Sequence, residues 1–166
     1  VTFIEQLRGN SAAVYARSRP LIDACGLSED EVKILVAYKM DTPYNFYKWF
    51  NAWLTGARRE KAIVNAIGPA FTLLHRAQEK LPVVTKKCGR GIEVGTVPTL
   101  MEAFTNFKTH FAPGSFFHFW GLSSFSTDDK VVNKFMAAPD KDSIVYTCGK
   151  LTGVQMDPFA PGGMAT

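Results

Sequence analysis

The sequence predicts an α+β fold, in which a helical N-terminal half is followed by a half built mainly of strands. Over residues 1–81, apolar side chains recur at helical spacing behind recognisable helix-start signals. From Pro82 onward, short stretches rich in β-branched and aromatic residues alternate with turns that contain glycine and proline. Helices first and strands afterwards are typical of α+β proteins, and 166 residues suffice for one domain with a buried core.

Two of the predicted helices rest on a cap and on a run of apolar residues. Ser28 and Glu31 form a capping-box pattern, which predicts that a helix begins there and continues through the apolar stretch that follows. A later helix follows the apolar positions between Ile63 and Leu81. Gly68-Pro69 interrupts that second pattern, so we expect the helix to be kinked or split in two at this point.

Between these two lies a predicted helix rich in aromatic residues. We expect it to open at Asp41-Thr42-Pro43, because proline is well accommodated in the first turn of a helix. Its spacing places Phe46, Phe50 and Trp53 on one face. Aromatic residues at this spacing are typical of core packing, and we assign Phe50 and Trp53 to the core.

The second half begins with a strand over residues 83–94, "VVTKKCGRGIEV", whose ends are β-branched. The tail from residue 157, "DPFAPGGMAT", is rich in turn residues and is expected to form no regular element. Between them we expect, in order, a helix over 98–108, a turn at Pro113-Gly114, a strand over 115–122, a short helix over 128–136 capped by Thr127, and strands over 143–149 and 151–156.

Composition narrows the classes of function. No apolar stretch approaches the roughly 20 residues that a membrane-spanning helix needs. The net charge of +4 is spread along the chain and forms no basic stripe, which argues against a nucleic-acid partner. The three cysteines lie far apart, and no histidine pair has metal-binding spacing. We therefore expect neither a disulfide framework nor a metal site.

Arg90 is the first candidate functional residue, because glycine stands on both sides of it. Gly89 and Gly91 allow the backbone to approach a ligand closely. The guanidinium offers a planar fork of donors suited to a phosphate or a carboxylate. An ordinary edge-strand arginine with turn glycines would give the same triplet.

A cluster of hydroxyls is the second candidate. Ser123, Ser124, Ser126 and Thr127 follow an aromatic run and precede two aspartates. At the end of a strand, one hydroxyl can point toward a ligand while another satisfies backbone groups. A polar surface loop is the alternative interpretation.

Taken in order, these segments resemble the mono-ADP-ribosyltransferase superfamily, in its arginine–serine–glutamate branch. In that family a helical half precedes a strand with an Arg-Gly pair. A second strand ends in Ser-x-Ser, and a later strand carries Glu-x-Glu. The matching segments over residues 30–166 are "YKMDTPYNFYKWFNAWL" for the family's helix with Tyr and Asn, "CGRGIEV", "FWGLSSFSTDD", and "GKLTGVQM" for the strand that leads toward the glutamates.

The resemblance implies a single domain over residues 1–166, mainly helical over 1–81 and mainly β over 82–166, with a split β-sheet or sandwich core. Two departures from the family pattern stand out. Gly89 occupies a position where the family often has an aromatic residue, and no glutamate follows Glu102. We expect the Glu-x-Glu motif, and with it the C-terminal part of the domain, to lie beyond Thr166.

The resemblance also implies a reaction. Members of the family split the bond between nicotinamide and ribose of NAD and transfer ADP-ribose to a protein side chain. Its partners would be NAD, as substrate, and a target protein, with arginine the default acceptor. The fold occurs in secreted toxins, injected effectors and animal surface enzymes, so it does not fix where the protein acts. A secreted effector or toxin acting inside a host cell is one option it allows.

Roles for individual residues follow from the same resemblance. Arg90, Ser124 and Ser126 would be the catalytic residues that this chain contains. Arg90 would hold NAD through its phosphate or ribose, and the backbone of Gly91 would bind the nicotinamide amide. Ser124 would orient the ribose and the glutamate, while Ser126 would brace the strand end. Phe135 would line the nicotinamide pocket.

Three other functions are open at this stage. The chain would be a non-catalytic NAD-binding or protein-interaction domain if the glutamates are truly missing. A nucleic-acid binder would use the aromatic residues and the positive charge. A hydrolase built on Ser124 would need a nucleophile elbow, Gly-x-Ser-x-Gly, which the sequence lacks there.

Overall fold

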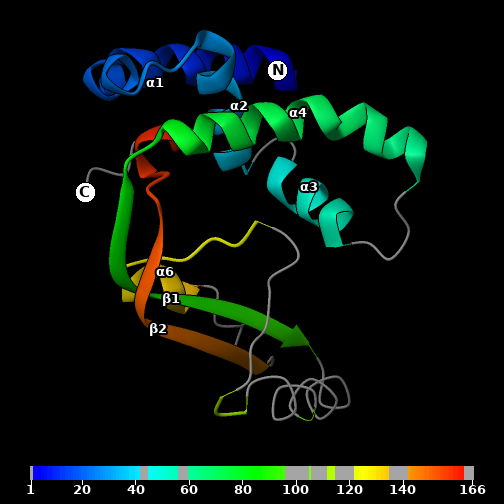
Figure 1. Cartoon of the computed structure of the whole chain (residues 1–166), viewed down its shortest axis with the longest axis vertical. Helices are drawn as coiled ribbons and strands as arrows, with labels where there is room; N and C mark the ends of the chain where they lie inside the picture. The colour runs from blue at the N-terminus through cyan, green and yellow to red at the C-terminus, as the bar shows by residue number, and fades with distance from the viewer. Residues whose placement is uncertain are drawn as a thin grey trace. The chain divides into compact units, whose positions relative to one another are not determined.

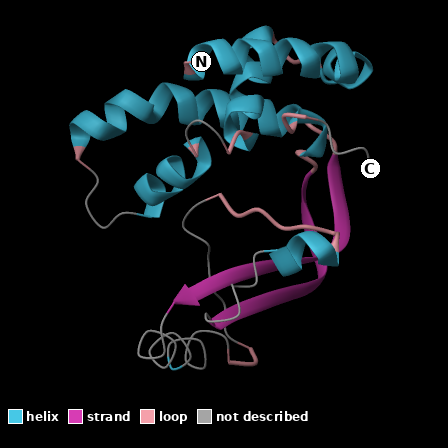
Figure 2. Cartoon of the chain, turned by 180° about the vertical axis from the view of Figure 1, so that it is seen from behind, coloured by secondary structure: helices cyan, strands magenta, loops and turns pink. Residues whose placement is uncertain are grey.

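The computed structural model describes residues 2–41, 45–55, 60–95, 105, 112–114, 122–134 and 142–162. Helices and a two-stranded antiparallel sheet are both present, which confirms an α+β protein at this coarse level (Figures 1 and 2). The chain forms two compact units. The helical unit comprises Val1–Val84 with Gly153–Thr166, and the strand unit comprises Thr85–Thr152.

The first helix, α1 (Phe3–Cys25), was not singled out by the sequence patterns. It begins at a capping box, in which the Thr2 hydroxyl accepts a hydrogen bond from the Glu5 backbone N–H and the Glu5 carboxylate accepts one from Thr2. It ends at Gly26, whose φ of 61° is the left-handed geometry typical of a helix C-terminus. The helical geometry is interrupted at Ser18, two residues before Pro20.

Helix α2 (Glu29–Lys39) lies at the centre of the helical unit and contacts α1, α3, α4 and the short helix η1. The predicted capping box is confirmed, since Ser28 and Glu31 each bond to the backbone of the other. The side chains of Val32, Leu35 and Val36 are fully buried. Because α2 touches every other helix described in its unit, these residues form the middle of the core.

Helix α3 (Phe46–Thr55) begins later than predicted. Its first turn starts from the carbonyl of Asn45, which accepts hydrogen bonds from Lys48 and Trp49, while Asp41 stands outside the helix. Residues 42–44 lie outside the described part of the chain. Phe50 is fully buried, as predicted, whereas Trp53 is only half-buried, so its assignment to the core was wrong in degree.

Helix α4 (Lys61–Lys80) runs unbroken through Pro69, so the predicted split at Gly68-Pro69 is wrong. A proline inside a helix removes one backbone hydrogen bond, and tertiary packing can compensate for that loss. Here Phe71 stacks on Phe50 of α3 with ring centroids 5.9 Å apart, and Leu74 is buried in the core. Both contacts lie on the C-terminal side of the proline and hold that part of the helix against the core.

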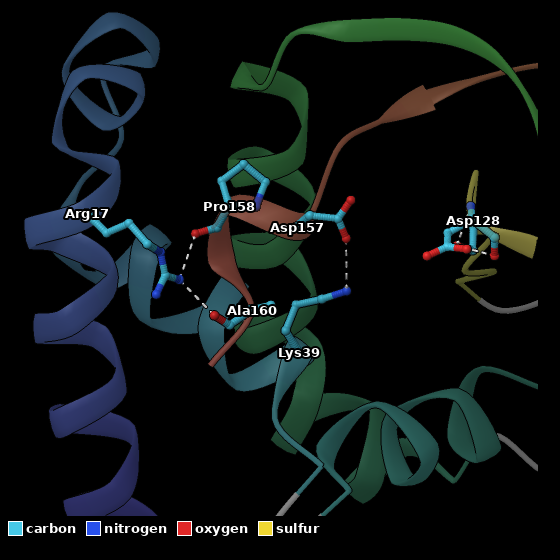
Figure 3. A network of polar contacts seen from close by, with 7 residues as sticks. Arg17, Lys39, Asp128, Asp157, Pro158 and Ala160 are labelled. Carbon is cyan, nitrogen blue, oxygen red and sulfur yellow. Dashed lines mark hydrogen bonds and ion pairs between the residues drawn. The ribbon is translucent and has the colours of Figure 1, made fainter. Parts of the chain in front are cut away.

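The tail forms a packed element, contrary to the prediction. Asp157–Phe159 is the 3-10 helix η1, and the side chain of Phe159 is fully buried. Arg17 of α1 donates hydrogen bonds to the carbonyls of Pro158 (3.2 Å) and Ala160 (2.7 Å), as Figure 3 shows. Lys39 of α2 pairs with Asp157 at 3.7 Å. The tail is therefore held by Arg17 and Lys39, which lie more than 100 residues earlier in the sequence.

Strands β1 (Val83–Gly95) and β2 (Asp142–Val154) pair with each other and bend together along their length (Figures 1 and 2). Strand β1 confirms the prediction over 83–94. The two predicted strands at 143–149 and 151–156 are one strand, because Gly149 keeps a negative φ and continues the extended backbone. The hydroxyls of Thr85 and Thr152 lie 2.9 Å apart across the pair.

Short elements fill part of the segment between the strands. The turn predicted at Pro113-Gly114 is present, with a φ of 85° at Gly114. The predicted short helix is α6 (Asp129–Lys134). The helix predicted over 98–108 and the strand over 115–122 lie outside the described residues, except for Thr105 and Leu122.

Candidate functional site

The two segments singled out by the sequence are paired with each other in the strand unit. Gly89 of β1 and Ser126 form an antiparallel bridge in which each backbone N–H donates to the carbonyl of the other, both at 2.8 Å. Both backbone polar groups of Gly89 bond to Ser126. The segment around Ser126 therefore lies along one edge of β1, and β2 lies along the other edge. Backbone pairing thus brings the glycine–arginine and serine–phenylalanine–serine stretches into contact.

Arg90 is half-buried and lies beside Phe125. Its guanidinium carbon stands 6.0 Å from the centre of the Phe125 ring, which is a cation–π contact. Burial raises the pKa of Tyr146 on β2, and the positive charge of Arg90 opposes part of that rise. Arg90 therefore lies within electrostatic reach of a phenol as well as over an aromatic face.

The alternation of side chains along paired strands explains why Arg90 contacts Phe125. Directly opposite residues of an antiparallel pair project to the same side, and successive residues project to opposite sides. The pairing of Gly89 with Ser126 therefore groups Arg90 with Phe125, as observed. Ser124 is exposed, and the aromatic ring between the two serines is the group found against the guanidinium.

Ser126 holds the turn that leads into α6. Its hydroxyl accepts a hydrogen bond from the backbone N–H of Asp128 at 3.0 Å. The Asp128 carboxylate in turn accepts from the backbone N–H of Lys130 at 2.8 Å, and its carbonyl accepts the first helical bonds. Asp128 is thus the cap of α6, and the prediction that Thr127 caps this helix is wrong. The role expected of Ser126, to brace the strand end, stays a prediction.

Gly89 lies in a closely packed part of the strand unit. A Cβ atom placed on it would lie 3.2 Å from Cγ2 of Val132 on α6 and 3.5 Å from the carbonyl oxygen of Tyr146. Contacts of 3.2 Å to a side chain are tighter than carbon atoms normally allow. The buried Val132 therefore leaves little room for a larger side chain at this position.

A cavity of about 420 Å³ lies next to this bridge. Its lining is largely polar and comes from β1, the turn before α6, α6 itself and β2. The residues are Lys87, Cys88, Gly89, Thr127, Asp129, Val132, Asn133, Val145 and Thr147.

The chemistry of this cavity combines a cation, a carboxylate, an amide and hydroxyls. Burial raises the pKa of Cys88, and the nearby Cys148 thiol raises it further, so this cysteine is a neutral group and a poor nucleophile at neutral pH.

None of Arg90, Ser124 and Ser126 lines the cavity. The sequence patterns missed Lys87, Asn133 and Thr147, because three separate elements bring them together.

The remaining predicted residues have simple placements. Gly91 follows Arg90 in β1 and is half-buried. Phe135, predicted to line a nicotinamide pocket, lies outside the described residues.

Across the described ranges, His, Cys, Asp and Glu do not gather in groups of three that could hold a metal ion. None of the helices described is both long and apolar enough to cross a membrane.

Comparisons of the chain with protein-family models, with curated proteins and with solved structures give no match.

Proposed function

We propose that the chain is an NAD-dependent mono-ADP-ribosyltransferase domain, in which β1 and residues 122–126 form part of the NAD site. The observation that supports this proposal is the pairing of Gly89 with Ser126. The resemblance in motif order requires these two distant segments to be neighbours. If the two motifs occurred in this sequence by chance, their segments would have no reason to be neighbours.

Arg90 is the residue proposed to bind NAD. Its delocalised guanidinium makes paired hydrogen bonds to phosphate oxygens, and stacking on an aromatic face restrains its orientation. Phe125 supplies such a face at 6.0 Å. In the proposal, Phe125 therefore positions Arg90, while Ser124, exposed at the same segment, donates to the ribose.

The reaction proposed breaks the bond between ribose C1′ and the nicotinamide nitrogen. Nicotinamide takes the bonding electron pair and leaves as a neutral molecule. A nucleophilic side chain of the target protein, arginine by default, then bonds to C1′ and loses a proton. The intermediate ribosyl group is cationic, so a carboxylate beside it lowers the barrier, as in glycoside hydrolysis.

Within these 166 residues, no glutamate follows Glu102 to supply that carboxylate. Asp128, two residues after Ser126, is occupied in capping α6. We therefore expect the chain to bind NAD and to release nicotinamide only slowly. The same observation favours the second candidate, a non-catalytic NAD-binding or protein-interaction domain on this fold.

The test is NAD binding measured by titration calorimetry on the chain and on Arg90→Ala and Arg90→Lys. Loss of one charged hydrogen bond costs roughly 1.5–3 kcal/mol, so Arg90→Ala should bind NAD about tenfold or more weakly. Lysine should restore part of the affinity, because it keeps the charge without the planar fork. Arg19→Ala is the matched control, since Arg19 is an exposed arginine on α1 paired with Asp23. Equal NAD affinity of Arg90→Ala and the parent chain would remove Arg90 from the site.

Nicotinamide release separates the two candidates. A chain that binds NAD and shows slow but Arg90-dependent release is a transferase domain with an incomplete set of carboxylates. A chain that binds NAD and releases none fits the non-catalytic domain. A chain that does not bind NAD contradicts the transferase and the NAD-binding domain, and leaves only the protein-interaction domain.

A further inference from the structure

A groove in the strand unit lies between α6 and the two strands, which run beside this helix in Figures 1 and 2. It is the cavity of about 420 Å³ next to Gly89. Arg90 and Ser124, the side chains proposed to bind NAD, do not line it. Small-molecule sites occupy about 300–1,000 Å³, so the groove has room for a small ligand of its own.

The two strands turn one face toward the groove. On β1, Lys87 and Gly89 line it and are two residues apart. On β2, the same holds for Val145 and Thr147. Side chains two residues apart in a strand lie on the same face of a sheet. Arg90 is one residue from Gly89 and therefore belongs to the opposite face, which separates the groove from the proposed NAD contact.

Helix α6 forms the facing wall. Asp129, Val132 and Asn133 line the groove, and their spacing of three and four residues puts them on one side of the helix. Val132 is buried and lies so close to β1 that a Cβ atom on Gly89 would be 3.2 Å from it. The cap at Asp128 fixes the start of the helix. The wall is therefore held in place by packing and by a cap.

The lining carries one charge of each sign, Lys87 from β1 and Asp129 from α6. Both side chains are exposed, and within the described part of the chain neither forms a hydrogen bond or an ion pair. Neighbouring charges are directed elsewhere, since Lys86 alternates to the other face of β1 and the Asp128 carboxylate accepts from the backbone of Lys130. A ligand in the groove thus meets one cation and one carboxylate, both available.

We propose that this groove binds a free α-amino acid, with Lys87 holding the carboxylate and Asp129 holding the ammonium group. Hydrogen bonds between charged partners are the strong ones, and a zwitterion makes one with each side chain. A ligand with charges of one sign only would be opposed by one of the two. The lining adds hydroxyl, amide and apolar contacts from Thr127, Thr147, Asn133, Val132 and Val145.

Nuclear magnetic resonance of the isotope-labelled chain tests the proposal. The probe is an equal mixture of the proteinogenic L-amino acids at neutral pH, followed by its members one at a time. We expect a member of the mixture to shift the amide signals of Gly89, Asp129 and Asn133 in a saturable way. The signals of α2 and α4 should stay in place.

Derivatives of the bound amino acid identify the two charged contacts. Its carboxamide lacks the carboxylate, and its N-acetyl form lacks the ammonium group. Each should bind the parent chain about tenfold or more weakly than the amino acid does. In Lys87→Gln the amino acid and its carboxamide should bind equally, because the partner of the missing carboxylate is gone. In Asp129→Asn the amino acid and its N-acetyl form should bind equally for the corresponding reason.

Two matched controls keep the test specific. Lys86→Gln and Lys130→Gln replace lysines that are exposed and do not line the groove, and they should leave the affinity for the amino acid unchanged. Lys87→Gln should bind NAD as tightly as the parent chain does, so this proposal and the NAD site fail separately. Circular dichroism shows whether each variant is folded.

Three results would overturn the proposal. If no amino acid shifts the signals of the groove, the groove is not an amino-acid site. Undiminished binding in both Lys87→Gln and Asp129→Asn would place the ligand elsewhere on the chain. Tighter binding of a dicarboxylate such as succinate, or of a diamine such as putrescine, than of any amino acid would assign the groove to ligands with one sign of charge.

Discussion

The helical unit and the strand unit are held together in different ways. In the helical unit, fully buried side chains from several elements meet, among them Val14, Leu35, Phe50 and Phe159. In the described part of the strand unit, the buried apolar side chains are Cys88 and Val132, and backbone pairing at Gly89 joins the segments. The comparison teaches that the fold's stability and its candidate chemistry reside in different units.

The largest effect expected from this comparison is in the helical core. Phe50→Ala should lower the free energy of unfolding by about 3–5 kcal/mol, because it leaves a cavity where Phe50 now stacks on Phe71. Trp49→Ala, one position earlier on the same helix and largely exposed, should cost less than about 1 kcal/mol. Urea denaturation followed by circular dichroism measures both. Similar losses for the two variants would mean that α3 is oriented differently.

The next effect is in the strand unit and concerns two glycines of one sheet. Gly89→Ala should lower stability by roughly 1–3 kcal/mol, because its new methyl group lies 3.2 Å from Val132. Gly149→Ala meets no atom within 4 Å and should be neutral or raise stability by about 0.5 kcal/mol. Thermal unfolding of both variants is the measurement. If Gly89→Ala is as stable as Gly149→Ala, α6 does not pack on β1 in this way.

A smaller effect is a pH dependence that belongs to the helical unit. Burial acts to raise the pKa of Glu31, but hydrogen bonds from Lys80 (2.7 Å) and Ser28 outweigh it, so the folded-state pKa lies below 4.5. The stabilisation from ionised Glu31 is therefore complete above pH 4.5 and is lost as the pH falls through the folded-state value. Glu31→Gln should cost about 1–2 kcal/mol at pH 7 and progressively less at acid pH.

Glu29→Gln is the control for this titration. Glu29 pairs with Lys33 at 2.7 Å, but its side chain is 71% exposed, and exposed pairs contribute little. Its removal should change stability by less than about 0.5 kcal/mol at any pH. A constant cost of Glu31→Gln from pH 7 to pH 3, measured by urea denaturation, would show that the Glu31 charge is not the stabilising feature.

The smallest stability effects separate the two serines of the strand unit. Ser126→Ala removes the hydroxyl that accepts from Asp128 and should cost about 1 kcal/mol. Ser124→Ala should leave the thermal midpoint nearly unchanged, because Ser124 is exposed, and should instead weaken NAD binding or slow nicotinamide release. Unaltered NAD behaviour of Ser124→Ala returns this segment to the interpretation of a polar loop.

Local signals predicted single elements best, because capping and periodicity act within a few residues. The Ser28–Glu31 capping box and the strand over 83–94 are present as predicted. The Thr2–Glu5 capping box carries the same signal and would have predicted α1. The packed tail could not be predicted, since Arg17, which binds it, is distant in the sequence.

In the candidate site, the sequence singled out the two segments but predicted neither their pairing nor which side chains meet. The contact of Arg90 with Phe125 follows from the register in which Gly89 pairs with Ser126. That register depends on both segments, so neither motif alone predicts it. The cap at Asp128 was mistaken for Thr127 because both residue types cap helices and they are neighbours. The functional roles of Arg90, Gly91, Ser124, Ser126 and Phe135 all stay predictions.

The central claim is that the strand unit binds NAD at the paired segments, and hydrogen–deuterium exchange with and without NAD tests it most directly. We predict that NAD slows amide exchange mainly in peptides covering residues 85–95 and 122–134, and that Arg90→Ala abolishes this protection. Peptides of α2 and α4 should change little. Unchanged exchange throughout, or protection confined to the helical unit, would contradict the claim.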